Sequence, residues 1–268
     1  MRTAVITLAH GRHTHLAGQA AALARSSASP EVYVVVAMDD PAVPEVVPGA
    51  DVVQVPRVHG ALPLAAARNA GVARARELGA ELLVLLDVDC LPSPELVGRY
   101  REVAAVRGGV LCGPVGYLPP PASAGYPTTG LSKLARPHPA RPVPAAGEVV
   151  PAEDPDLFWS LSFALTVSDW DRVGGFCEDY VGYGGEDTDF GHAVARAGVG
   201  MWFVGGAWAY HQHHGETGPP VHHIDDILRN AAIFHRRWGW WPMRGWLEEF
   251  ARRGLVAVDP ATGLWVRT

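Results

Sequence analysis

Short apolar runs alternate with longer amphipathic stretches along the first half of the chain. Apolar runs predict buried strands at residues 3–9, 31–38, 51–55, 82–86 and 109–115. Stretches rich in Ala and Leu predict helices at residues 13–25, at 64–78, and from Ser93-Pro94-Glu95 onward. This alternation is typical of an α/β fold in which helices cover both faces of a mostly parallel central sheet.

The second half of the chain is less regular. Residues 118–157 contain closely spaced prolines and no apolar period, and a segment of this kind is usually a functional loop or disordered, so we predict a mobile loop. Further strands are expected at residues 158–165 and 201–204, and further helices at 186–197 and 224–238. We predict one domain over residues 1–223 and a helical extension over 224–268 that packs on it.

Composition narrows the class of protein. With 268 residues, 48% of them hydrophobic, the chain can bury a substantial core, and its formal charge of -6 argues against a nucleic-acid partner. No stretch is apolar enough for a membrane span, and the first residues already show a strand pattern, so we expect a cytoplasmic protein. Cys90, Cys112 and Cys177 are too few and too far apart for a disulfide framework, and we expect buried thiols.

An Asp-Val-Asp string ends the apolar run at 82–86. Asp87 and Asp89 therefore lie where a parallel sheet exposes the carboxyl ends of its strands and where ligands bind. Because strand side chains alternate, we expect both carboxylates on one face. They could bind Mg²⁺ or Mn²⁺, which bridges to phosphate oxygens, but Asp at such a place can also simply cap a helix.

A second acidic cluster begins the helix predicted at 186–197. Glu186, Asp187 and Asp189 follow the Gly-rich approach Tyr183-Gly184-Gly185. The helix dipole favours acidic residues in a first turn, but this cluster exceeds what capping needs. Glu186 and Asp189 share a helix face while Asp187 points elsewhere, and a carboxylate here could take a proton from an acceptor hydroxyl.

Histidines follow the last predicted strand in the string Tyr210-His211-Gln212-His213-His214. A neutral imidazole is a common metal ligand, and this density of histidines in a chain with an Asp-x-Asp pair favours a shared metal site. His222 and His223 are expected to be surface residues.

These motifs, in this order, resemble a known family. Asp87-Val88-Asp89, then Gly174-Gly175-Phe176, then Gly184-Gly185-Glu186-Asp187-Thr188-Asp189, then the histidines, are similar to the GT-A-fold glycosyltransferases. The likeness is strongest to the carboxy-terminal part of galactosyltransferase and polypeptide N-acetylgalactosaminyltransferase catalytic domains, and it extends to bacterial family 2 transferases. It covers most of residues 1 to about 215 and implies a single Rossmann-like domain.

The resemblance implies roles for the acidic and histidine clusters. Asp89 would bind Mn²⁺ or Mg²⁺ together with His211 or His214, and Asp87 would hold the ribose or the sugar of the donor. Asp187 would be the catalytic base. A set of neighbouring residues would contact the donor sugar or the acceptor, namely Glu186, Tyr183, Gly185 and Asp189.

The resemblance also implies a nucleotide site at the amino-terminal strands. His10 and Arg12 would contact uridine diphosphate, Asp39 would read the uracil or ribose with help from Asp40, and Arg68 with Asn69 would lie on the nucleotide side.

The implied function is a metal-dependent, inverting transfer of a hexose or N-acetylhexosamine from a UDP-sugar to an unidentified hydroxyl acceptor. Closure of the Gly-rich stretch from Gly174 to Gly185 could exclude water, and residues 118–157 would lie beside the acceptor. A sugar-nucleotide-synthesising nucleotidyltransferase stays open, although His10-Gly11-Arg12 is poor in Gly for its phosphate loop. A non-catalytic carbohydrate-binding protein on the same fold also stays open, as does a metallohydrolase built on the histidines, which lacks an obvious His-Glu-x-x-His helix.

Overall fold

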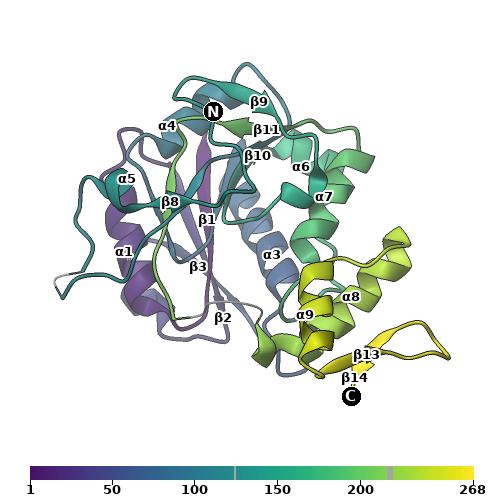
Figure 1. The fold of residues 1–268 in the computed structure, drawn as a ribbon. Helices are drawn as coiled ribbons and strands as arrows, with labels where there is room; N and C mark the ends of the chain where they lie inside the picture. Colours follow the sequence, from purple (N-terminus) through teal and green to yellow (C-terminus); the bar gives the residue numbers. More distant parts are fainter. Residues whose placement is uncertain (124, 216–219) are drawn as a thin grey trace.

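The central feature of the computed structural model, which describes residues 1–123, 125–215 and 220–268, is an eight-stranded sheet (Figure 1). The strand order is β3-β2-β1-β4-β10-β6-β11-β9. The parallel half consists of β1 (Thr3–Ala9), β2 (Val32–Met38), β3 (Asp51–Val55) and β4 (Leu82–Leu86). The predicted α/β class with a mostly parallel sheet is confirmed.

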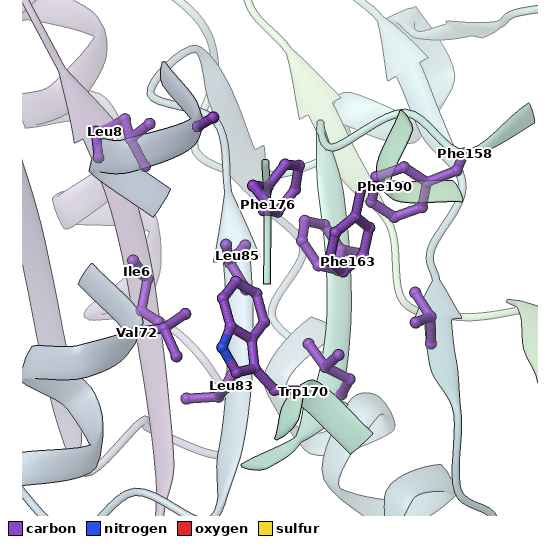
Figure 2. Close-up of a cluster of buried hydrophobic side chains, with 14 of the residues drawn as sticks. Ile6, Leu8, Val72, Leu83, Leu85, Phe158, Phe163, Trp170, Phe176 and Phe190 are labelled. Carbon is purple, nitrogen blue, oxygen red and sulfur yellow. The ribbon is translucent and has the colours of Figure 1, made fainter. Parts of the chain in front are cut away.

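Helices cover both faces of this parallel half, as the alternation of strand and helix predicts. The helices that connect its strands are α1 (His13–Leu23), α2 (Val43–Val46) and α3 (Leu64–Glu77), and α4 (Leu96–Ala104) follows β4 later in the chain. Ile6, Leu83 and Leu85 point to the side of α3, where Val72 packs on them (Figure 2). The alternate residues Val5 and Val84 pack on α4 from the other face. Strands β1, β2 and β4 are buried on both sides and are therefore mainly apolar, whereas the edge strand β3 is only half-buried and contains Asp51 and Gln54.

The other half of the sheet is mixed. It contains β6 (Val110–Cys112), β9 (Val149–Pro151), β10 (Ser162–Thr166) and β11 (Met201–Val204). Strand β10 runs antiparallel to both β4 and β6. Helices α6 (Val167–Val173) and α7 (Glu186–Arg196) follow in the chain. Trp170 of α6, Phe190 of α7 and the loop residue Phe176 form an aromatic cluster with Phe163 of β10 (Figure 2).

Several predicted boundaries were wrong. The strand predicted at 109–115 is divided, because Pro114 has no N–H to donate and Gly113 lies where an added Cβ would be 2.1 Å from the Ala207 carbonyl oxygen. The strand predicted at 158–165 begins only at Ser162. The helix predicted from Ser93 begins at Leu96 without a side-chain cap, because the preceding residues form a strand.

A second sheet crosses the carboxyl ends of the first. Within the described residues its strands are β5 (Cys90–Pro92), β7 (Val115–Tyr117), β8 (Arg136–Pro137) and β12 (Ala209–His211). Residues 118–157 are therefore not without regular structure, since they supply β8, β9, helix α5 (Leu131–Leu134) and the 3₁₀ turn η1 (Pro155–Leu157). A mobile loop beside the acceptor stays a prediction.

The carboxy-terminal segment packs beside α7 (Figure 1). It consists of the 3₁₀ turn η2 (Val221–His223), α8 (Ile224–Trp238), α9 (Arg244–Arg252) and the hairpin of β13 (Val256–Val258) and β14 (Trp265–Arg267). In the described part of the chain no helix is both long and apolar enough to cross a bilayer. Cys90 and Cys112 are buried, Cys177 is half-buried, and all three are free thiols.

Asp189 joins this segment to the domain. Its side chain is 2% exposed, and one oxygen accepts hydrogen bonds from Tyr180 Oη at 3.1 Å and from Arg237 Nε and Trp238 Nε1, each at 2.7 Å. The two partners on α8 thus bind the first turn of α7 through one buried carboxylate.

We expect Asp189→Ala to destabilise the protein by about 2–4 kcal/mol, because buried donors lose their acceptor and the charge of Arg237 loses its partner. Urea unfolding measures the loss. Asp171→Ala is the matched control, since Asp171 forms an exposed ion pair with Arg76 at 2.7 Å, and its loss should stay below about 1 kcal/mol. Equal losses in the two variants would contradict the docking role of Asp189.

Candidate active site

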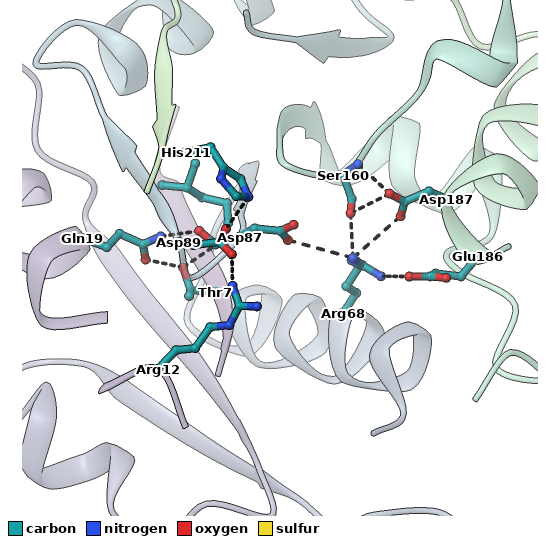
Figure 3. Close-up of polar contacts among 11 residues, drawn as sticks. Thr7, Arg12, Gln19, Arg68, Asp87, Asp89, Ser160, Glu186, Asp187 and His211 are labelled. Atoms are coloured by element: carbon teal, nitrogen blue, oxygen red, sulfur yellow. Dashed lines mark hydrogen bonds and ion pairs between the residues drawn. The ribbon is translucent and has the colours of Figure 1, made fainter. Parts of the chain in front are cut away.

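A cavity of about 1700 Å³ opens at the carboxyl ends of the parallel strands. Its wall includes the loop after β1, the Asp87–Asp89 turn after β4, the first turn of α7 and parts of the carboxy-terminal segment. Ligands bind at this edge in open α/β sheets because the loops there diverge and leave a crevice. The candidate residues group into two clusters that face this cavity (Figure 3).

The first cluster contains Asp89, His211 and His214. The Nε2 atoms of the two histidines lie 3.5 Å from different oxygens of Asp89, and the candidate ligand atoms all lie within 4.8 Å of one another. The pairing of β12 with β5 puts His211 opposite Cys90, next to Asp89 in the chain. Of the Asp-x-Asp pair, Asp89 thus lies beside the histidines, and the prediction that they share a metal stays a prediction.

This donor set fits a divalent cation. Asp89 is 6% exposed, and its Oδ1 has no hydrogen-bond partner among the described residues, so a buried acceptor remains for a ligand. Burial lowers the pKa of His211, which favours the neutral imidazole that binds metals. Arg12 pairs with the other oxygen of Asp89 and supplies positive charge there.

Asp87 and Asp89 reach the cavity from a turn and not from a strand. The chain turns after β4, and the amide of Cys90 donates to the Asp87 carbonyl at 2.9 Å. The strand-alternation argument for a shared face was therefore wrong. Asp87 points toward Arg68, while Asp89 points toward Arg12 and His211 (Figure 3).

The second cluster surrounds the buried guanidinium of Arg68 on α3. Arg68 lies 3.3 Å from Glu186, 3.7 Å from Asp187 and 4.0 Å from Asp87. It also donates to Ser160 Oγ at 2.6 Å. The residues that meet around this positive charge come from α3, from the turn after β4, from the loop before β10 and from the start of α7 (Figure 3).

Ser160 fixes the orientation of Asp187. Its amide and its hydroxyl both lie within hydrogen-bond distance of Asp187 Oδ2, at 2.9 and 3.0 Å. Since Arg68 can only donate to Ser160 Oγ, the hydroxyl hydrogen of Ser160 points to Asp187. The other oxygen, Asp187 Oδ1, has no hydrogen-bond partner in the described part of the chain, although Asp187 lines the cavity.

The carboxyls beside Arg68 have perturbed acidity. Burial raises the pKa of Glu186 to about 7, and the negative charge of Asp187 adds to this while Arg68 opposes it. Burial likewise raises the pKa of Asp87 to about 7, against the opposing charge of Arg68. Such shifts are common at functional sites, although structural ion-pair networks produce them too.

The predicted nucleotide residues divide into two groups. His10 and Arg12 line the cavity, and His10 binds the Met38 carbonyl through Nδ1 and Arg57 through Nε2, both at 2.7 Å. Asp39 and Asp40 do not line it. Asp39, at φ 50°, pairs with Arg57 at 2.8 Å, and Asp40 accepts hydrogen bonds from the Gly11 amide and from His13.

Asn69 and Asp189 also lie outside the cavity lining. Asn69 exchanges hydrogen bonds with the backbone of Phe176 and so holds the Gly174-Gly175-Phe176 loop. Asp189 holds the carboxy-terminal segment. Gly185 and Tyr183 do line the cavity, and Tyr183 stacks on His223 at 4.7 Å.

The Gly-rich approach to α7 is anchored and does not have the form of an open lid. Gly182 donates to the Leu62 carbonyl at 2.9 Å, and a Cβ on Gly182 would lie 2.3 Å from the Asp226 carboxylate of α8. Gly185, at φ 92°, begins α7 in a backbone conformation that favours glycine. The glycines thus permit close packing, and closure of this stretch over a bound ligand stays a prediction.

Some cavity residues escaped the sequence argument. Arg57 lies in a segment without a readable period, and the strand predicted at 158–165 indicated no functional role for Ser160. Trp240 and Trp246 also line the cavity, although no motif indicated a role for them. Their clustering near the end of the chain was visible, but its position beside the cavity depends on how α8 docks.

Comparisons with known proteins agree with this geometry. Residues 153–215 match the family model described as the N-terminal domain of galactosyltransferase. Over 80 residues the chain is 32% identical to validoxylamine A glucosyltransferase of Streptomyces hygroscopicus subsp. jinggangensis, which covers 30% of this chain. The chain spans only 18% of that relative's length.

Solved structures show the same fold. TarS of S. aureus in complex with UDP-GlcNAc has a TM-score of 0.59 at 12% identity, covering 93% of this chain and 76% of that one. GalNAc-T7 with UDP, GalNAc and Mn²⁺ has a TM-score of 0.59 at 14% identity, covering 94% and 57%. The mannosyltransferase PcManGT of Pyrobaculum calidifontis, in complex with GDP-Man and Mn²⁺, has a TM-score of 0.54 at 15% identity, covering 95% and 70%.

The family model spans β10, α7, β11 and β12, which carry Asp187 and His211, and the structural likeness spans nearly the whole chain. The chain thus has the fold of these glycosyltransferases, and its residues 153–215 are similar to the galactosyltransferase family model.

Proposed function

We propose that the protein is a metal-dependent, inverting glycosyltransferase that moves a hexose or N-acetylhexosamine from a UDP-sugar to an acceptor hydroxyl. The observation that carries the proposal is the presence, in one cavity, of an Asp-His-His cluster and of a carboxylate, Asp187, with one oxygen held by Ser160 and the other without a hydrogen-bond partner among the described residues. TarS and GalNAc-T7 hold uridine nucleotides, which favours UDP over GDP as the donor nucleotide here.

The leaving-group side of the cavity is the Asp89 cluster. Asp89, His211 and His214 would hold Mn²⁺ or Mg²⁺, which when bound supplies positive charge to the departing diphosphate. Arg12 lies beside them and can donate to a phosphate oxygen in place of Asp89. His10 and Arg57 line the same part of the cavity, where the nucleoside would lie.

Asp187 is the group best placed to act as base. An inverting transfer needs one base that removes the acceptor proton during in-line attack on the anomeric carbon, and no covalent nucleophile. Ser160 orients the carboxylate through two hydrogen bonds to Oδ2, while Oδ1 lies 3.7 Å from Arg68 Nη2 and makes no hydrogen bond among the described residues, so Oδ1 is the oxygen that would accept the proton. Orientation before reaction reduces the entropy that must be lost in the transition state.

Glu186 suits a different role. With a pKa raised to about 7 by burial, it holds its proton more readily than an ordinary Glu near neutral pH and can donate a hydrogen bond to a sugar hydroxyl. Its Oε2 is buried without a hydrogen-bond partner among the described residues, so a ligand could satisfy it.

Metal dependence is tested by titration calorimetry of UDP with Mn²⁺ and with EDTA. We expect tighter binding with Mn²⁺, and loss of that difference in Asp89→Ala, because one ligand of the cluster is removed. Asp179→Ala removes an exposed carboxylate that lines the cavity outside the cluster and should keep the difference. Equal UDP affinity with metal and with chelator in the unaltered protein would remove the metal from the account.

The base assignment is tested by the rate of UDP release from a panel of UDP-hexoses, with water as acceptor. Asp187→Asn should keep nucleotide affinity but lower kcat by about 10²–10⁴-fold. Ser160→Ala should lower kcat by about tenfold with KM unchanged, since it disorients the base, and Ser160→Thr should restore kcat because it keeps the hydroxyl. Normal turnover in Asp187→Asn would show that another group is the base, and a Thr variant as slow as the Ala variant would reduce Ser160 to packing.

The acidity of Glu186 gives a stability prediction with a definite sign. Because the folded pKa is raised from 4.5 to about 7, the unfolded chain releases this proton first, and stability falls as pH rises through this window. Glu186→Gln removes this loss, so it should be more stable relative to the unaltered protein at pH 8 than at pH 5, by up to about 3 kcal/mol. Urea unfolding at the two pH values is the measurement, with the exposed Glu102→Gln as control. A pH-independent effect of Glu186→Gln would contradict the raised pKa.

A further inference from the structure

Arg141 is a buried cation that the proposed reaction does not use. It belongs to the Pro-rich segment and is 9% exposed. Its Nη1 and Nη2 atoms are buried and have no hydrogen-bond partner among the described residues. The guanidinium instead lies over two aromatic rings, with its carbon 5.3 Å from the centroid of Trp159 and 5.3 Å from that of Phe203.

Such a group needs a counter-charge. A buried charge is costly unless it is paired and hydrogen-bonded, and an arginine does not lose its charge on burial as a lysine can. Contacts with aromatic faces offset only about 1–2 kcal/mol of that cost. The ion pairs of the described residues include no carboxylate within 4.0 Å of Arg141, so those residues supply no neutralising partner there.

A small cavity lies against the guanidinium. Its volume is about 10 Å³, and apart from Arg141 its wall is formed mainly by proline, valine and aromatic side chains. This space holds roughly one water-sized occupant. Tyr117, His138 and Trp159 line both this cavity and the large one, so they separate Arg141 from the candidate active site.

We propose that this small cavity is a binding site for a single halide ion, chloride under ordinary conditions, held by the guanidinium of Arg141. The volume admits one atom-sized occupant and is too small for a phosphate or a sugar carboxylate. A water molecule would fill the space but would leave the charge uncompensated. The prolines in the wall carry no N–H groups, so the positive charge of the site comes from Arg141.

The site is coupled by packing to the proposed metal ligands. Tyr117, which lines the small cavity, packs against His211 with ring centroids 5.0 Å apart and ring planes tilted by 38°. His138 packs edge-on against Trp159 at 4.9 Å. A bound anion would therefore fix the wall behind His211, and its effect is on stability whether or not the protein transfers sugar.

The first test is thermal unfolding in sodium chloride, sodium bromide and sodium gluconate at matched ionic strength. The halides should raise Tm in proportion to the logarithm of their concentration, and gluconate, which is too large for the cavity, should not. Arg141→Met should lose the halide effect and stay folded without halide, because an unbranched apolar side chain replaces the buried charge among aromatic rings. Arg136→Met removes an exposed charge from the same segment and should keep the halide effect. Equal stabilisation by gluconate, or an undiminished halide effect in Arg141→Met, overturns the proposal.

The second test does not depend on a variant that folds. Crystals of the unaltered protein grown or soaked in bromide should show an anomalous peak within hydrogen-bond distance of Arg141 Nη1 or Nη2. Its absence at a bromide concentration that saturates the Tm effect, or an ordered water in its place, rejects the site.

Discussion

The rest of the candidate site depends on the interaction of the buried Arg68 guanidinium with the carboxylates around it. One guanidinium, buried on α3, binds Ser160 and Glu186 and lies within 4.0 Å of Asp87 and Asp187. Without Arg68, the carboxylate of Asp87 after β4 would face those of Glu186 and Asp187 on α7 in a buried setting. Buried carboxylates so arranged either take up a proton or move apart. Arg68 also lies over the Phe176 ring at 5.0 Å, and Phe176 stacks on Phe190 of α7 at 4.2 Å. The polar site and the aromatic core thus share one support.

This arrangement explains why α7 is held so firmly. The helix begins at Gly185 and carries Glu186 and Asp187 toward Arg68, while Asp189 binds α8 on another side. Three carboxylates this close in the chain would repel one another if they shared one environment. They have different partners instead, with Glu186 and Asp187 near Arg68 and Asp189 bound to α8. The carboxy-terminal segment binds the start of α7 through Asp189. It also supplies Trp240 and Trp246 to the cavity wall, so it forms part of the candidate site.

Patterned features could be predicted from the sequence. The strands at Thr3–Ala9, Asp51–Val55 and Leu82–Leu86 were predicted with their observed bounds, because each is a short and mainly apolar run. Asp89 and His211 could be expected to meet, since each follows a strand near the same sheet edge. Their roles in binding, and a cytoplasmic location, stay predictions.

Features that depend on tertiary context could not be predicted. Asp189 reads as part of a functional acidic string, but its contacts are with residues of α8 and the Gly-rich approach, and sequence spacing does not reveal helix docking. Ser160 lies in a turn where the sequence predicts a strand, and Arg141 lies beside a proline in a segment without a period, so the sequence does not indicate where either side chain points. The glycines of the approach to α7 suggest mobility by composition, yet they allow close contact with Asp226 and Met243.

The most direct test of the account is a crystal structure of the protein with Mn²⁺ and an unreactive UDP-sugar analogue. We predict Mn²⁺ on Asp89, His211 and His214 in contact with the diphosphate, and Asp187 Oδ1 facing the anomeric carbon from the side opposite the diphosphate. A metal bound elsewhere, or a diphosphate beside Asp187, would contradict the assignment of the leaving-group and base sides of the cavity.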